Sequence, residues 1–202
     1  MTKPLKPQQK TRSKRTPRKA TMRYLENAAL YYMERFASSK ANLRRIMMAK
    51  VERSARFHGT DREKGVAQVE DIIARFLRSG LLDDEMYARS KAISLHHRGS
   101  SSRAIRAKLT SKGVDGPIIH MALAFLEAED PDSEFSAAIA FARRRRIGPF
   151  RRQRPSGDDT GDLQLHEKDL TALRRAGFCF DIARRVVDAQ SEESLSLDRR
   201  PI

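Results

Sequence analysis

Residues 80–114 read GLLDDEMYARSKAISLHHRGSSSRAIRAKLTSKGV, and this stretch decides the fold. Asp83 or Asp84 is a good N-cap for a helix, because a short acidic side chain can accept the free backbone N–H groups of the first turn. The two leucines before these residues can anchor the start of that helix to a core. Gly99 is typical of a helix end. The first half of the stretch therefore predicts one helix of about four turns.

The second half of the stretch predicts another, shorter helix. Ser101 or Ser102 fits its N-cap, and Gly113 fits its C-terminal stop. Pro117 then suits the first turn of a third helix, where its missing N–H has no partner to lose. The stretch and its continuation predict a unit of three helices joined by short turns.

The chain contains three variants of this three-helix unit, in which caps, apolar pairs, glycine stops and helix restarts recur at related positions. A shift of 62 residues places Leu43 on Ile105, and a shift of 64 residues places Gly113 on Gly177. No segment alternates apolar and polar residues as a half-buried strand does. The predicted fold is therefore all-α, an elongated array of three tandem three-helix repeats.

The predicted organisation follows from this repeat and from composition. Residues 1–20 carry Lys, Arg, Pro and Gln with few apolar side chains, which predicts a disordered basic arm. The other boundaries are repeat 1 at 21–79, repeat 2 at 80–128, repeat 3 at 129–190 and a polar, frayed tail at 191–202.

Charge is unevenly placed along the 202 residues. The chain has 41 Lys and Arg against 26 Asp and Glu, a net charge of +15. Residues 1–20 hold eight Lys or Arg and no acid, and residues 143–154 hold seven Arg and no acid. These two segments account for the whole excess, so the rest of the chain is balanced. The sequence predicts a polyanionic partner that is contacted at these two places.

Several classes of protein are not supported. The single cysteine, Cys179, excludes an internal disulfide and a multi-cysteine metal site, and it is predicted to be a small, buried or half-buried thiol in a cytoplasmic protein. The apolar runs are too short for a membrane span. No glycine-rich phosphate loop is present. We expect no enzyme activity, no cofactor, no metal and no membrane partner, and a monomeric chain.

At these residues the sequence resembles a known family. Gly80–Asp84 running into Tyr87 and Ala88, followed by Ile105–Val114, is similar to the central repeat of the RecX regulatory proteins, which are bacterial modulators of the RecA recombinase. Ser39–Arg45 and Gly177–Val186 are similar to the flanking repeats. The resemblance covers about residues 21–190.

The resemblance implies an elongated, curved molecule. It implies binding within the groove of the RecA–DNA filament, with inhibition of ATP hydrolysis, strand exchange and coprotease activity. Relative to the compact family pattern, the sequence predicts an expanded turn at about 52–65 and an inserted loop at about 149–165.

The first candidate contact is the arginine cluster of the third repeat. Its members are Arg143, Arg144, Arg145, Arg146, Arg151, Arg152 and Arg154. Four consecutive arginines on a helix point in every direction, so at least one is predicted to lie near the core. The cluster suits phosphate or an acidic protein surface, but it also suits a solvated helix end whose dipole favours cations.

The second candidate contact is a set of basic residues at similar positions in the second helix of each repeat. These are Arg44, Arg45, Arg103, Arg106, Lys108, Arg174 and Arg175. They could line one face of the array, or they could be ordinary exposed positions.

Other patterns favour structural roles. His96 and His97 are adjacent, so they do not form the i, i+4 pair of a helical metal site. Asp83 and Asp84 could be paired catalytic acids, but helix capping explains them. The segment 102–123 could form a helix-turn-helix DNA reader, and the repeat explains the same pattern. The alternative to a filament regulator is a general basic DNA-binding protein, which binds single- and double-stranded DNA without sequence preference.

Overall fold

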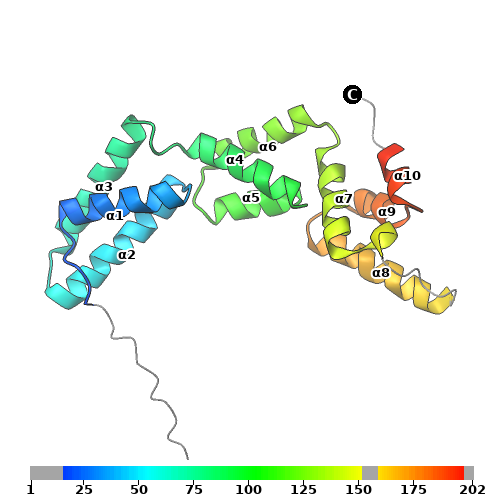
Figure 1. The fold of residues 1–202 in the computed structure, drawn as a ribbon, viewed down its shortest axis with the longest axis horizontal. Coiled ribbons are helices and arrows are strands. Elements are labelled where there is room, and N and C mark those ends of the chain that lie inside the picture. Colours follow the sequence, from blue (N-terminus) through cyan, green and yellow to red (C-terminus); the bar gives the residue numbers. More distant parts are fainter. Residues whose placement is uncertain (1–15, 152–158, 198–202) are drawn as a thin grey trace, which may run out of the picture.

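The computed structural model describes residues 16–151 and 159–197, and every regular element in these two ranges is a helix. The elements are α1 (Met22–Arg35), α2 (Lys40–His58), α3 (Arg62–Arg78), α4 (Asp84–His97), α5 (Ser102–Thr110), α6 (Gly116–Glu129), α7 (Ser133–Arg145), the 3-10 turn η1 (Gly148–Phe150), α8 (Asp159–Arg175), α9 (Phe180–Val187) and α10 (Glu192–Leu197). They form an elongated, arched array in which the repeats follow one another in chain order (Figure 1). The predicted all-α repeat array is confirmed.

Short polar side chains begin the helices, as the sequence predicts. The N-caps of α2, α3, α4 and α5 are Ser39, Asp61, Asp83 and Ser101, and each side chain accepts a backbone N–H of the first turn. For α4 and α5, where the sequence leaves two candidates each, the N-caps are therefore Asp83 and Ser101. The predicted helix stops Gly99 and Gly113 have positive φ angles, as do Gly80 and Gly177 after α3 and α8.

Each group of three helices buries its own apolar stripe. The core of α1–α3 includes Leu25, Leu43 and Ile72. The core of α4–α6 includes Tyr87, Ile105 and Ile119, and the core of α7–α9 includes Phe135, Leu173 and Val186. Three separate cores support three units, while the exact boundaries stay predictions. Among the described residues, no helix is both long enough and apolar enough to cross a membrane.

The turn between the second and third helices is shorter than predicted. The expanded turn at 52–65 is wrong, because α2 continues to His58 and α3 begins at Arg62. Asp61 caps α3, so the charged residues after it form an exposed first helical turn and no loop. Gly65 lies inside α3, where a Cβ would come within 2.4 Å of Val51 Cγ1. This close approach explains a glycine that looks like a loop residue in the sequence.

The third repeat is more helical than predicted. The loop expected at 149–165 is wrong in its second half, because α8 begins at Asp159 and runs for 17 residues. Asp169 makes this helix hard to recognise, because it interrupts the apolar stripe and is nevertheless buried. Its carboxylate accepts from Gly148 N at 2.9 Å and from Arg151 Nη2 at 2.6 Å, so the buried charge is satisfied.

Both ends of the array are more ordered than composition indicates. After Gln190 the expected frayed tail instead forms α10, whose Leu195 is 2% exposed and belongs to the third core. The predicted disordered arm extends to residue 20, but residues 16–20 lie on α2. Ala20 N donates to Ser54 Oγ at 2.8 Å, and His58 Nε2 lies 2.6 Å from Pro17 O. The rest of the predicted arm, 1–15, lies outside the described residues.

Candidate functional site

A serine hydroxyl fastens each repeat to the next. Ser39 Oγ accepts from Asn42 N at the start of α2 and donates to Lys112 O, 2.5 Å away, just after the end of α5. Ser101 Oγ does the same one repeat later, donating to Ala176 O at 2.7 Å, just after the end of α8. One hydroxyl therefore caps the N-terminus of one helix and a free C-terminal carbonyl of another.

A carboxylate from the following repeat makes the second bond of each joint. Asp84 Oδ1 accepts from Lys40 N at 2.7 Å, and Glu134 Oε2 accepts from Ser102 N at 2.9 Å. Lys40 and Ser102 are the first residues of α2 and α5. Asp83 caps its own helix, so the adjacent aspartates have different structural tasks, and neither needs a catalytic one.

A glycine permits the close approach at both joints. A Cβ on Gly113 would lie 2.4 Å from Ala41 Cβ, and a Cβ on Gly177 would lie 2.6 Å from Ser101 Oγ. Such contacts are too short for any side chain. The glycines that end α5 and α8 thus also let the next helix start against them.

The second helices of the repeats consequently lie end to end. The C-terminus of α8 meets the N-terminus of α5, and the C-terminus of α5 meets the N-terminus of α2. Figure 1 shows α2, α5 and α8 following one another along one side of the array, with α4 and α6 on the other side of its middle. Because their dipoles point the same way, the ends that meet carry opposite partial charges. We call this arrangement the second-helix row.

The joint carboxylate Asp84 has a testable signature. Burial raises the pKa of its carboxyl above the ordinary value, the Lys40 N–H partly opposes this, and the nearby Asp115 adds to the increase. A raised pKa stabilises the folded chain at low pH, and this contribution is lost as pH rises through that pKa. Relative to Asp84→Asn, the wild type should therefore lose stability between about pH 3 and about pH 7 in urea unfolding.

The alanine variant separates the charge from the hydrogen bond. Asp84→Asn keeps an oxygen for Lys40 N, whereas Asp84→Ala leaves that N–H to water and should cost about 0.5–1 kcal/mol at neutral pH. Equal stability of the two variants at neutral pH would contradict a capping role.

Two cations converge at the joint between α2 and α5. Arg45 Nη2 donates to Asn42 Oδ1 at 2.8 Å, and Lys112 Nζ lies 3.4 Å from the same oxygen. The amide oxygen of the buried Asn42 therefore brings these two cationic side chains together. Arg44 is less available, because its Nε pairs with Glu70 of α3.

Three arginines gather at the joint between α5 and α8. Arg174 and Arg175 end α8 and are exposed, and Arg103 lies in the first turn of α5. The Cβ of Arg103 would contact a side chain placed on Gly177, so Arg103 lies directly against the end of α8. Among the described residues, no carboxylate pairs with any of these three arginines.

Arg106 and Lys108 continue the basic character along α5. Both are exposed, and α5 contains three basic residues and no acid. Helix α6, across the middle repeat, ends instead with the acids Glu127 and Glu129. The predicted basic residues of α5 thus lie on a helix of the second-helix row, and Arg106 lines the same hollow as the acids Glu127 and Glu134.

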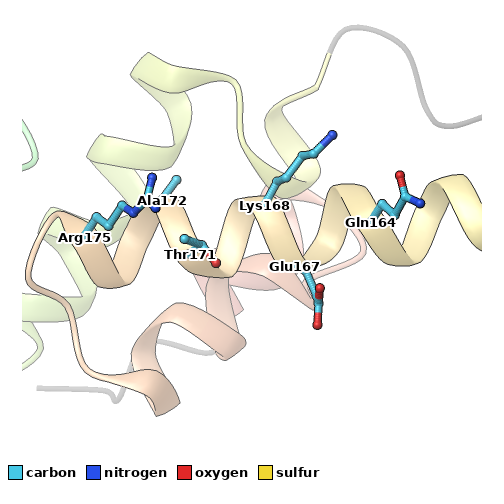
Figure 2. Close-up of a pocket in the computed structure, with 6 residues that line it drawn as sticks. All are labelled: Gln164, Glu167, Lys168, Thr171, Ala172 and Arg175. Atoms are coloured by element: carbon cyan, nitrogen blue, oxygen red, sulfur yellow. The ribbon is translucent and has the colours of Figure 1, made fainter.

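A shallow hollow of about 420 Å³ follows one face of α8 (Figure 2). It is lined by Gln164, Glu167, Lys168, Thr171, Ala172 and Arg175. All six come from one helix at helical spacing, and Lys168 and Glu167 project from opposite sides in this view. The hollow is an open, polar surface of α8, and it continues from Arg175 at the joint towards the start of that helix.

The arginine cluster at the end of α7 differs from its prediction. The sequence predicts that at least one of Arg143–Arg146 lies near the core, but all four are exposed. The core is instead closed by Phe141, Ala142 and Ile147 on either side of them. Arg143 pairs with Glu192 of α10, and the guanidinium groups of Arg144 and Arg145 each lie 5.8 Å from the Phe141 ring. Aromatic rings and α10 hold these side chains outside the core.

Of the remaining members of that cluster, the structure describes Arg151. Arg151 pairs with the buried Asp169 and therefore helps to close the third repeat. Arg152 and Arg154 lie outside the described residues.

The thiol and histidine predictions have different outcomes. Cys179 is predicted to be buried or half-buried, but it is exposed, because it stands at the N-cap of α9 and its neighbour Phe178 fills the core. His96 Nε2 lies 2.7 Å from Ser133 O, which is a structural contact between α4 and α7. Within the described ranges, no group of three or more His, Cys, Asp or Glu is placed to hold a metal ion.

The joints are not apparent from the sequence, because each joins residues far apart in the chain. The serine, carboxylate and glycine are visible there only as caps and stops. A sequence signal for these contacts between repeats is the 62-residue shift, which places Ser39 on Ser101 and Lys40 on Ser102.

Comparison with known proteins agrees with this geometry. The family model for the second three-helix domain of RecX matches residues 83–123. The chain is 43% identical over 180 residues to the regulatory protein RecX of Myxococcus xanthus (strain DK1622), covering 89% of this chain and 92% of that protein. It is 28% identical over 178 residues to the regulatory protein RecX of Agrobacterium fabrum (strain C58 / ATCC 33970), covering 88% and 89%.

The fold is also similar to solved structures. The crystal structure of RecX from Lactobacillus salivarius matches with a TM-score of 0.59 at 19% identity, covering 84% of this chain and 96% of that chain. A second crystal structure of regulatory protein RecX matches with a TM-score of 0.56 at 20% identity, covering 83% and 72%.

Proposed function

The chain belongs to the RecX family of regulatory proteins, and on that premise we propose that it binds the RecA–DNA filament and inhibits its ATPase, strand-exchange and coprotease activities. The observation that carries the proposal is the second-helix row. It presents exposed cations at successive joints along an elongated array, which suits a partner that is itself extended and repeating.

The proposed mechanism depends on bridging. Arg45 and Lys112 lie at one joint, and Arg103, Arg174 and Arg175 lie at the next. A row that stays in contact with adjacent subunits of a filament opposes the changes in their packing that accompany ATP turnover. The bound array also occupies space that a second DNA duplex needs for strand exchange. Inhibition then requires no catalytic residue.

The test is the ATPase of the RecA protein from the same organism on single-stranded DNA. Adding this protein at substoichiometric amounts should slow ATP hydrolysis, since one array acts on several filament subunits. The assay should be run at about 50 mM and about 200 mM salt, because an interaction that uses exposed cations weakens with salt. Unchanged hydrolysis at the lower salt concentration would overturn the proposal.

A general basic DNA-binding protein is the second candidate, favoured by the net charge of +15. That function requires tight binding to bare DNA of any sequence and a steep loss with salt. Filament binding that is much stronger than binding to bare DNA excludes this candidate. Equal binding to filament and to bare duplex excludes the filament regulator.

A further inference from the structure

A second basic surface lies at the opposite end of the molecule from α8, on the outer face of α1. A hollow of about 520 Å³ there is lined by Arg18, Lys19, Arg23, Tyr24, Asn27 and Tyr31, among others. Three of these are cations, two are tyrosines and one is an amide. No carboxylate lines this hollow among the described residues.

The cations that precede α1 are held in place. Pro17 O and Ala20 N are bound to His58 and Ser54 of α2, so the segment between them, which carries Arg18 and Lys19, cannot swing away. A ligand phosphate at this hollow therefore meets three cations, Arg18, Lys19 and Arg23.

The tyrosine rings are presented outwards with cations beside them. Tyr31 is 56% exposed, and the guanidinium of Arg35 lies 4.5 Å from its ring centroid. Lys50 Nζ lies 5.7 Å from the ring centroid of Tyr24. Tyr24 and Tyr31 are seven residues apart, so they lie on the same face of the helix. The apolar core of the first repeat needs Tyr24 in part, but it does not need Tyr31.

A smaller hollow lies beside Pro17 on α2. Its volume is about 430 Å³, and its lining includes Pro17, Arg53, Arg56 and Phe57 together with one carboxylate, Glu52. Phe57 is 58% exposed. Both hollows are therefore lined by an exposed aromatic ring and by arginines.

We infer that the face of α1 formed by Arg18, Lys19, Arg23, Tyr24 and Tyr31 binds single-stranded nucleic acid. The Tyr31 ring stacks on a base, the three cations contact phosphates, and Asn27 is placed to bond a base edge. Base faces are accessible in a single strand and hidden in a duplex, so exposed rings distinguish the two, whereas cations alone do not. This site is separate from the second-helix row and needs no RecA.

The test compares single- and double-stranded DNA on the full chain, without RecA. Fluorescence anisotropy of labelled oligothymidine and of a duplex, each of about 20 nucleotides, gives the two affinities. Tyr31→Ala should weaken binding to oligothymidine by about 5- to 100-fold and leave duplex binding nearly unchanged. Tyr31→Phe keeps the ring and should bind as the wild type does. Leu30→Ala, which removes a neighbouring side chain that is 43% exposed, is the matched control and should have no effect.

A spectroscopic readout reports the stacking directly. The chain has no tryptophan, so Tyr31→Trp introduces a single indole at the site. Oligothymidine should quench its fluorescence, and duplex at the same occupancy should not. Equal losses on both DNA forms, a loss for Leu30→Ala as large as that for Tyr31→Ala, or an indole that does not respond would each overturn the inference. None of these outcomes depends on ATPase inhibition, so the proposed function is tested separately.

Discussion

Gly99→Ala is expected to lower the free energy of unfolding by about 2–4 kcal/mol, more than the loss expected for Asp84→Ala at the joint. Gly99 has a φ of 77°, where an alanine is strained. A Cβ at this position would also lie 2.3 Å from the backbone N and 2.7 Å from the Cα of Phe141 in α7. Backbone atoms in the middle of a helix cannot move aside as a side chain can, so α4 and α7 must separate.

Gly80 supplies the matched control. Its φ is 72°, close to that of Gly99, but a Cβ at Gly80 would have no atom within 4 Å. Gly80→Ala should therefore cost only the conformational part, about 1 kcal/mol. Urea unfolding followed by circular dichroism measures both. If the two variants lose the same stability, the contact between α4 and α7 is not the tight one described.

Replacing Arg103, Arg106, Arg174 and Arg175 together by glutamine should raise the concentration needed for half-maximal ATPase inhibition on the order of 100-fold. The four side chains are exposed, and within the described ranges none has a carboxylate partner whose loss would disturb the fold. The effect should shrink as salt is raised, because the lost interactions are screened.

The control removes the same charge elsewhere. Lys64, Arg78, Arg89 and Arg98 are also exposed, but they lie on or beside α3 and α4, outside the second-helix row. Changing these four to glutamine should alter inhibition only slightly. Arg143–Arg146 changed to alanine should have an intermediate effect, since Arg143 is already paired with Glu192. If the control set weakens inhibition as much as the row set, net charge and not the row determines binding.

Local chemistry made much of this fold predictable. Ser39, Asp83 and Ser101 are caps because their short side chains reach their own first-turn N–H groups, which is a property of a few consecutive residues. The apolar stripes around Leu43 and Ile105 are likewise local. The three-helix repeat follows from these features alone.

The remaining features depend on distant partners. Asp169 resembles an exposed helix residue until Arg151 and the Gly148 N–H are placed beside it. Leu195 resembles part of a polar tail until the third core is present to bury it. For the candidate site, the sequence predicts basic contacts on the second helices, and the joint contacts show that these helices lie end to end. Nothing in the sequence singles out Tyr31, whose distinguishing property is exposure.

The two joints of the row differ in what supports them. Between the second and third repeats, α4 and α6 both pack against α7 in addition to the joint itself. Between the first and second repeats, the hydroxyl, carboxylate and glycine contacts all converge on Ser39, Lys40 and Ala41. Bending should therefore concentrate at these three residues. The second and third repeats then move as one body, and the first repeat moves relative to them. This motion shifts the tyrosine face of α1 towards or away from a partner bound by the second and third repeats.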